Sequence, residues 1–186
     1  MPVVHRIDGR RLELVEGDIT RQPVDAIANA ANTGLRGGGG VDGAIHRAAG
    51  PALLDELRRR YPTGTSTGTA VETAGHRLAA KWVLHAVGPV WHGGAHGEAE
   101  QLAAAYRSCL ALADELGASS LALPAISLGA YGYPRDEGAE IAISTVASHL
   151  AGATGLTLVR FVLREETYPS FVEALGRLMP RGDFPP

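Results

Sequence analysis

Short apolar segments alternate with longer amphipathic segments along most of the chain, and this alternation restricts the possible folds more than any other feature. Residues 11–16 alternate polar and apolar side chains, which predicts an edge strand, and residues 26–30 predict a short buried strand. Further strands are expected at residues 69–73, 81–87, 120–124 and 156–163. Helices are expected at residues 42–49, 52–61, 98–116, 135–150 and 168–179, with Gly50-Pro51 and Gly117 as stops.

Strands that alternate with helices predict an α/β fold: a three-layer α/β/α sandwich around a central mixed, largely parallel sheet. The chain has 186 residues, of which 45% are hydrophobic, enough for one substantial core. We therefore expect a single domain over residues 1–180 and a disordered tail at 181–186.

Composition excludes several classes of function. The 17 basic and 20 acidic side chains create no broad positive field, so generic nucleic-acid binding is not expected. The lone cysteine, Cys109, allows no internal disulfide and lies in a pattern typical of a buried helix face. No segment has the length and apolar character of a membrane span or a signal peptide, which predicts a cytoplasmic protein without membrane contact. We also expect a monomer.

Two glycine-rich segments each join a predicted buried strand to a predicted helix. Four glycines, Gly37 to Gly40, precede Asp42, and the segment PAISLGAYGYP covers residues 124–134. Each glycine costs about 0.5–1 kcal/mol against alanine in regular structure, so a run needs a reason. Ligands of open α/β sheets bind at the carboxyl ends of the strands, where glycine loops and helix N-termini turn backbone N–H groups toward an anion. Two such loops predict a site for two linked phosphates.

Each feature also has a simpler interpretation. A glycine-rich loop can be merely flexible, Asp42 can be only a helix N-cap, and Tyr131 and Tyr133 can simply pack. Two loops with the same strand-to-helix placement nevertheless favour a ligand, a phosphorylated and nucleotide-like small molecule. His92 and His96 lack a matching carboxylate or cysteine pair, so no metal is expected.

The sequence does not contain the motifs of serine α/β-hydrolases or of dinucleotide-binding dehydrogenases. The residues around Ser127 lack the Gly-x-Ser-x-Gly elbow of α/β-hydrolases. The first glycine loop is not a GxGxxG followed by an acidic strand end, which argues against a dehydrogenase.

Five motifs together resemble the macrodomain family, most closely its MacroD-type branch. They are GDIT at 17–20, NAAN at 29–32, GGGGVDGAIHRAAG at 37–50, HAVGP at 85–89 and PAISLGAYGYP at 124–134. The likeness extends from about residue 12 to residue 179. It implies binding of ADP-ribose without a cofactor. It also implies removal of mono-ADP-ribose ester-linked to acidic side chains of proteins, deacetylation of O-acetyl-ADP-ribose, or both.

The resemblance also implies roles for residues at the adenine end. Asp18 would accept a hydrogen bond from the exocyclic amine of adenine, beside the backbone amide of Ile19, because a carboxylate suits that donor. Tyr168 would cover the face of the base. The alternatives are a turn aspartate after a strand and a core tyrosine at a helix start.

At the other end of the ligand, Asn32 would hydrogen-bond the distal ribose and Asp42 would face its anomeric carbon, both as catalytic residues. His46, one helical turn after Asp42, would support them or serve only as a structural histidine. The diphosphate would be surrounded by Gly39, Gly40, Val41, Ser127, Leu128, Gly129, Ala130 and Tyr131. Leu128 stands where this branch more often has threonine, which removes a hydroxyl but leaves the backbone donors.

The implied hydrolysis needs a water whose proton is taken either by Asp42 or by a phosphate oxygen of the substrate. The sequence does not choose between these bases. The rival function is a reader module that binds ADP-ribose on other proteins without cleaving it. The presence of Asn32, Asp42 and the full glycine motif favours the enzyme.

Overall fold

The computed structural model describes residues 2–179, which contain a mixed seven-stranded sheet. The strands are β1 (Val3–Ile7), β2 (Arg10–Glu16), β3 (Ala26–Ala31), β4 (Ala70–Ala74), β5 (Trp82–Val87), β6 (Ser120–Leu123) and β7 (Leu158–Leu163). Their order is β1-β2-β7-β6-β3-β5-β4. Strands β2, β7, β6, β3 and β5 run parallel, and β1 and β4 pair antiparallel at the two edges. The mixed, largely parallel sheet expected from the sequence is confirmed.

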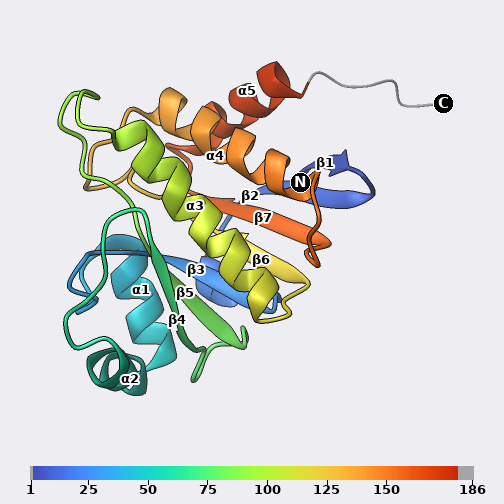
Figure 1. The fold of residues 1–186 in the computed structure, drawn as a ribbon. Helices are drawn as coiled ribbons and strands as arrows, with labels where there is room; N and C mark the ends of the chain where they lie inside the picture. The colour runs from blue at the N-terminus through green and yellow to red at the C-terminus, as the bar shows by residue number, and fades with distance from the viewer. Residues whose placement is uncertain (1, 180–186) are drawn as a thin grey trace.

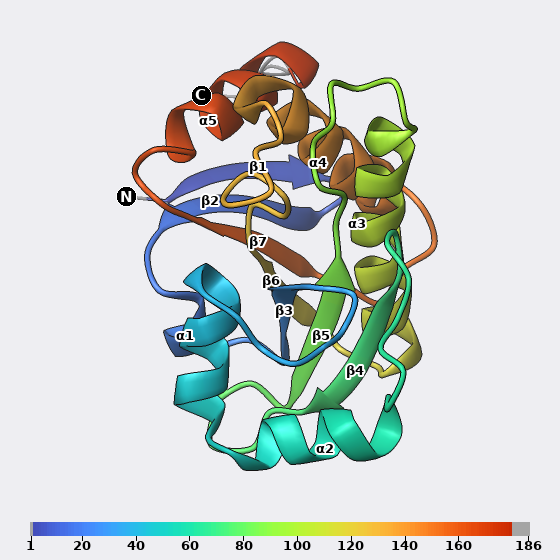
Figure 2. The same cartoon turned by 90° about the vertical axis from the view of Figure 1, so that its left-hand side faces the viewer.

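Helices cover both faces of the sheet and complete the expected three layers (Figures 1 and 2). They are α1 (Gly40–Ala49), α2 (Ala52–Arg60), α3 (Glu98–Glu115), α4 (Arg135–Leu150) and α5 (Tyr168–Leu178), with a 3-10 turn η1 (Ile19–Arg21). One hydrophobic cluster joins α3, α4 and α5 to the sheet, and a second joins α1 and α2 to its other face. Cys109 is buried in the first cluster, as expected. No helix within residues 2–179 combines the length and the apolarity that a bilayer crossing requires.

One edge of the sheet differs from the expectation. Residues 11–16 form a strand, but it is not an edge strand, because β1 pairs outside it through a turn at Asp8-Gly9. Both turn residues have positive φ, 48° and 82°, as tight hairpin turns of this kind require. Strand β1 is only half-buried along its length, so its sequence carries a weak strand signal. The tail expected at 181–186 lies outside the described residues.

Tyr106 on α3 holds the start of the loop that follows β6. Its ring is fully buried beside Phe161, and its hydroxyl donates to the carbonyl of Pro124 at 3.1 Å and accepts from the N–H of Ile126 at 2.9 Å. The side chain of Tyr106 therefore fixes the direction in which the loop at residues 124–134 leaves the sheet.

Glu98, the first residue of α3, holds the loop that follows β5. Its buried carboxylate accepts the backbone N–H groups of His92 (3.1 Å), Gly94 (3.2 Å) and His96 (2.7 Å). Burial acts to raise the pKa of Glu98, but these hydrogen bonds and its own N–H outweigh burial and lower the pKa to about 2. This loop is also tied to the one after β6, since Trp91 N–H donates to the carbonyl of Tyr131 at 2.9 Å.

Tyr106→Phe should destabilise the protein by about 1–3 kcal/mol, because it removes two buried hydrogen bonds, each of which contributes about 0.5–1.5 kcal/mol. Urea unfolding measures this difference. Tyr133→Phe is the matched control, since the Tyr133 ring is buried but its hydroxyl makes no hydrogen bond within residues 2–179. Equal losses of unfolding free energy in the two variants would show that the Tyr106 hydroxyl does not stabilise the loop after β6.

Glu98→Gln should reduce stability most near neutral pH. A carboxylate whose folded pKa lies below its ordinary value stabilises the fold above the ordinary value, and this contribution disappears as the pH falls toward about 2. The difference in urea midpoint between wild type and Glu98→Gln should therefore shrink as the pH is lowered below about 4.5. A difference that stays constant with pH contradicts the assignment.

Candidate functional site

A cavity of about 430 Å³ lies at the carboxyl ends of β7, β6 and β3, which are neighbours in the sheet. Both glycine loops line it, as the sequence predicts for loops at one end of a parallel sheet. The predicted residues that line it are Asn32, Gly39, Gly40, Val41, Asp42, Ser127, Leu128, Gly129, Ala130 and Tyr131. His46, Asp18, Ile19 and Tyr168 are not part of the lining.

The first glycine loop bends closely against the start of α1. A Cβ on Gly43 would lie 2.6 Å from the carbonyl oxygen of Gly38, so this helix position accepts only glycine. Gly37 and Gly40 have φ of 84° and 57°, which glycine adopts without strain. Gly39 is the N-cap of α1 and Asp42 lies inside the first turn, so the N-cap interpretation of Asp42 is wrong.

Both loops present backbone donors that the protein does not use. Gly40 and Val41 are the first residues of α1, where a helix has no internal acceptor for the N–H groups. The N–H groups of Gly129, Ala130 and Tyr131 likewise have no acceptor among residues 2–179. Unused donors on both sides of one cavity form a site for an anion with several oxygens.

The carboxylate of Asp42 is held by a buried polar network that the sequence analysis did not find. Asn29 on β3 donates from Nδ2 to Oδ1 of Asp42 at 2.8 Å, and the same nitrogen lies 3.1 Å from Nδ1 of His85 on β5. Nε2 of His85 lies 2.9 Å from Oγ1 of Thr73 on β4. Asn29, His85 and Thr73 are all fully buried. The network thus runs from the sheet edge to the cavity.

His85 is uncharged in this network. Burial, and then the neighbouring His46, lower its pKa to about 3. Because Nδ1 of His85 accepts from Asn29, the ring proton is on Nε2 and is donated to Thr73. The amide of Asn29 is thereby oriented with its donors toward both Asp42 and His85. A polar residue inside an otherwise apolar strand is the sequence signal that could have pointed to this role.

Asn32 and His46 lie next to the Asp42 carboxylate. Asn32 donates from Nδ2 to the carbonyl of Gly37 at 3.0 Å and so holds the first glycine loop. Nε2 of His46 lies 3.3 Å from Oδ1 of Asp42, but the angles are not those of a hydrogen bond, and the ring packs beneath Gly37. The second carboxylate oxygen of Asp42 faces Gly38 and remains available to the cavity.

The second loop is held by close packing around Ser127. Ser127 has φ of 67°, unusual for a residue with a side chain, and its buried Oγ has no hydrogen-bond partner within the described residues. A Cβ on Gly88, just after β5, would lie 2.2 Å from that oxygen. The side chain of Leu128 is buried and packs against Gly138 of α4, although the residue also belongs to the cavity lining.

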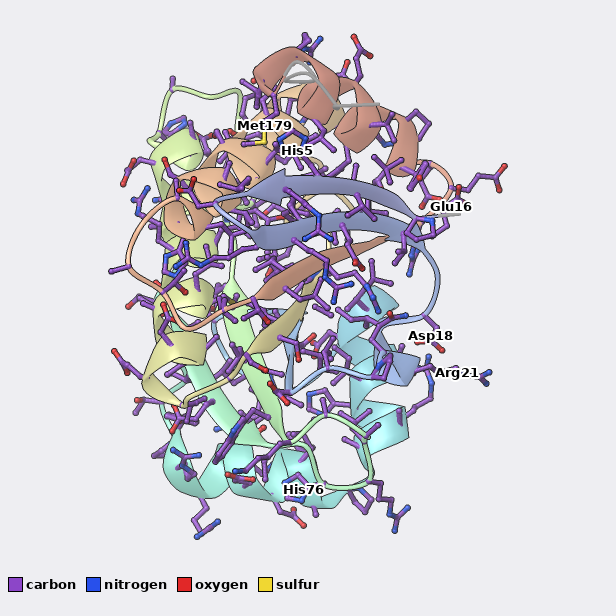
Figure 3. The ribbon with its side chains drawn as sticks, turned by 90° about the vertical axis from the view of Figure 1, so that its right-hand side faces the viewer. His5, Glu16, Asp18, Arg21, His76 and Met179 are labelled. Carbon is purple, nitrogen blue, oxygen red and sulfur yellow. The ribbon has the colours of Figure 1, made fainter. Side chains whose placement is uncertain are left out.

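The structure places the adenine-end residues implied by the resemblance outside the cavity lining, and their roles stay predictions. Asp18 caps η1, accepting from the N–H and hydroxyl of Thr20 at 2.9 and 2.7 Å, and Figure 3 shows it at the surface with Arg21. The hydroxyl and N–H of Thr20 lower the pKa of Asp18. Ile19 is buried in the second cluster, and Tyr168 packs against the first. Arg164, Glu166 and Thr167, which the sequence analysis did not name, line the cavity just after β7.

Metal and thiol chemistry find no support in the described part of the chain. Residues 2–179 contain no group of three or more histidine, cysteine, aspartate or glutamate side chains placed to hold a metal ion. The carboxylate nearest His96 belongs to Glu98, which is occupied by backbone N–H groups. Burial raises the pKa of Cys109 to about 12, so its thiol is not ionised at neutral pH.

Comparison with known proteins agrees with this geometry. The family model described as Macro domain matches residues 28–142. A protein of Salmonella typhimurium named O-acetyl-ADP-ribose deacetylase is 54% identical over 160 residues, which cover 85% of each chain. A macro domain-containing protein of Streptomyces coelicolor is 51% identical over 170 residues, covering 89% of this chain and 98% of the relative.

Two solved structures extend the likeness to three dimensions. The Oceanobacillus iheyensis macrodomain with ADP superimposes with a TM-score of 0.91 at 40% identity, covering 96% of this chain and 97% of that one. The Trypanosoma brucei macrodomain in complex with ADP-ribose gives 0.82 at 39% identity, covering 89% of this chain and 69% of that one. The fold, the cavity and these relatives together show that the chain belongs to the macrodomain family.

Proposed function

We propose that this protein binds ADP-ribose and hydrolyses an acyl ester on its distal ribose, acting as an O-acetyl-ADP-ribose deacetylase. Protein-linked esters of ADP-ribose with acidic side chains present the same bond and form a second substrate class. The observation that carries the proposal is one cavity that combines unused N–H groups from two loops with Asn32 and Asp42. The name of the Salmonella relative supports the same activity.

The arrangement of the cavity supports a position for the diphosphate and for the distal ribose. The diphosphate fits between the two loops, where backbone N–H groups stabilise its charge without basic side chains. Asn32 and Asp42 then lie on the side of the distal ribose. A carboxylate and a carboxamide are suitable partners for ribose hydroxyls, because together they offer donors and acceptors.

Hydrolysis requires water to attack the ester carbonyl carbon, after which the tetrahedral intermediate releases acetate and the ribose hydroxyl. Oδ1 of Asp42 already accepts a hydrogen bond from Asn29. Oδ2 of Asp42 is therefore the oxygen that can take the proton of the water. A phosphate oxygen of the bound substrate is the alternative base. In either case the protein's main contribution is to hold the ester, the water and the base together.

A reader module that binds ADP-ribose without turnover is the alternative function. The same loops would serve it, so binding alone does not separate the two. The buried network that orients Asp42 favours the enzyme, because a fixed carboxylate beside the ribose gives little to a site that needs only to hold the diphosphate.

Incubation of the protein with O-acetyl-ADP-ribose should release ADP-ribose and acetate. Chromatography measures the amount of each product. Replacing both Asn32 and Asp42 by alanine should lower the rate at least about a hundredfold, the lower range for loss of a positioned acid or base. Calorimetry with ADP-ribose should show that this double variant keeps much of its affinity. The parallel assay uses a protein mono-ADP-ribosylated on glutamate.

Asp55→Ala is the matched control, because Asp55 occupies the first turn of α2 as Asp42 does in α1, but is exposed and outside the cavity. It should leave turnover unchanged. Binding of ADP-ribose by the wild type with no release from either substrate would refute the hydrolase and support the reader.

A further inference from the structure

Charge is distributed unevenly along the chain. Residues 33–81 contain seven arginine or lysine side chains against four aspartate or glutamate side chains, although the whole chain has a net charge of −3. This segment is therefore positive and the remainder of the chain is negative. It forms α1, α2, β4 and the loops between β3 and β5. Both ribbon views place these elements together at one end of the molecule (Figures 1 and 2).

Four exposed arginines of this segment have no carboxylate partner. Glu56 and Glu72 pair with Arg60 and His76. Four other arginines form no ion pair within residues 2–179, and we call them the arginine cluster: Arg36, Arg47, Arg58 and Arg59. A helix C-terminus favours cations, which accounts for the members on α1 and α2 but not for Arg36 in the loop after β3.

Arg36 lies beside the part of the cavity in which the distal ribose is placed. A Cβ on Gly34 would lie 3.8 Å from Cγ of Arg36 and 3.5 Å from Oδ1 of Asn32, so both side chains flank the same loop residue. The guanidinium of Arg36 donates to the carbonyl of Pro62 at 2.8 Å, just after α2. Arg36 therefore connects the Asn32 side of the cavity to the end of α2.

The other members of the arginine cluster are held on the same side. The loop after α2 is fixed to the loop after β3, because the N–H of Thr65 donates to the carbonyl of Thr33 at 2.9 Å. On α1, Nη1 of Arg47 would lie 3.1 Å from a Cβ on Gly43, the position that faces the carbonyl of Gly38. The arginine cluster thus borders the first glycine loop and the residue that follows Asn32.

We infer that the arginine cluster binds acidic side chains next to the modified residue of a protein substrate that carries ADP-ribose on aspartate or glutamate. The inference rests on the proposed function, in which the ester lies beside Asn32 and Asp42. The acyl part of that ester belongs to the protein substrate, so the neighbouring residues of the substrate lie outside the cavity on this side. Carboxylates complement exposed guanidinium groups, which can bind them through two parallel hydrogen bonds. O-acetyl-ADP-ribose has no such neighbours and needs none of these arginines.

Two synthetic peptides of equal length test this inference. Each carries one glutamate that is mono-ADP-ribosylated through an ester, flanked by aspartates in one peptide and by asparagines in the other. At about 50 mM salt the wild type should release ADP-ribose from the aspartate peptide with a kcat/KM about fivefold higher, the scale of a few exposed ion pairs. The preference should fall below about twofold at about 500 mM salt, because salt screens exposed charges. The difference should be in KM, since a contact with flanking residues is equally strong in the ground state and the transition state.

Removing charge from the arginine cluster should abolish the preference. In the triple variant Arg36→Gln/Arg58→Gln/Arg59→Gln, kcat/KM for the two peptides should become equal. Its kcat/KM for the asparagine peptide and for O-acetyl-ADP-ribose should stay within about twofold of the wild type, because neither substrate offers acidic neighbours.

The matched control is the triple variant Arg6→Gln/Arg77→Gln/Lys81→Gln. These three exposed side chains form no ion pair within the described part of the chain. They lie at the end of the sheet opposite the cavity, because Arg6 is paired with Arg11 at the start of β2 and residues 77 and 81 precede β5. Both variants lose three positive charges, so an effect of net charge alone would be equal in the two. The control should keep the preference, and thermal melting checks that both variants are folded.

The inference is overturned if the wild type treats the two peptides alike, or if it hydrolyses O-acetyl-ADP-ribose but neither peptide. It is also overturned if the arginine variant keeps the preference, if the control loses it, or if the arginine variant slows all three substrates equally, which would place the effect in the cavity. Binding of a DNA or RNA oligonucleotide through these arginines without a peptide preference would identify a nucleic-acid surface and overturn it too.

Failure of the proposed function gives a different result. In each case above the wild type still hydrolyses an ester of ADP-ribose. A wild type that hydrolyses none of the three substrates would refute the proposed function. Calorimetry with the two intact peptides then still decides the inference, because tighter binding of the aspartate peptide supports it and equal affinity overturns it.

Discussion

The site depends on the buried amide of Asn29. A carboxylate that is almost fully removed from water needs hydrogen-bond donors, and Asn29 supplies one to Asp42 from the middle of the sheet. His85 on the neighbouring strand β5 accepts from the same amide, and Thr73 on the edge strand β4 holds the other side of the His85 ring. The first turn of α1 is thereby tied to β3, and the glycine loop between them must bend sharply to connect the two.

The rest of the cavity is built mainly from backbone that approaches other backbone closely. Gly43 allows the carbonyl of Gly38 to lie against α1, and Gly88 allows Ser127 to lie against the end of β5. Tyr106 holds the second loop from beneath through two backbone groups. Loops held in this way keep residues with unused N–H groups in the cavity lining before any ligand arrives, which lowers the entropic cost of binding. This arrangement explains how a chain of net charge −3 can hold an anion.

The sequence was sufficient to predict the layers, the parallel centre of the sheet and the meeting of the two glycine loops, because these follow from local periodicity and from strand direction. It did not predict β1, whose half-buried alternation is weak, nor the partners of Asp42, which lie on strands distant in the chain. Hydrogen bonds between distant elements leave no periodic signal. It also did not predict that Arg164, Glu166 and Thr167 line the cavity, because that depends on how the segment after β7 turns into α5.

A crystal structure of the protein with ADP-ribose tests the central claim most directly, namely that the two loops bind the diphosphate through backbone N–H groups. The account predicts phosphate oxygens within about 2.7–3.2 Å of N–H groups from both loops, including those of Val41 and Ala130, with the distal ribose beside Asp42. A ligand that binds outside the loops, or that is held there by side chains alone, would contradict it.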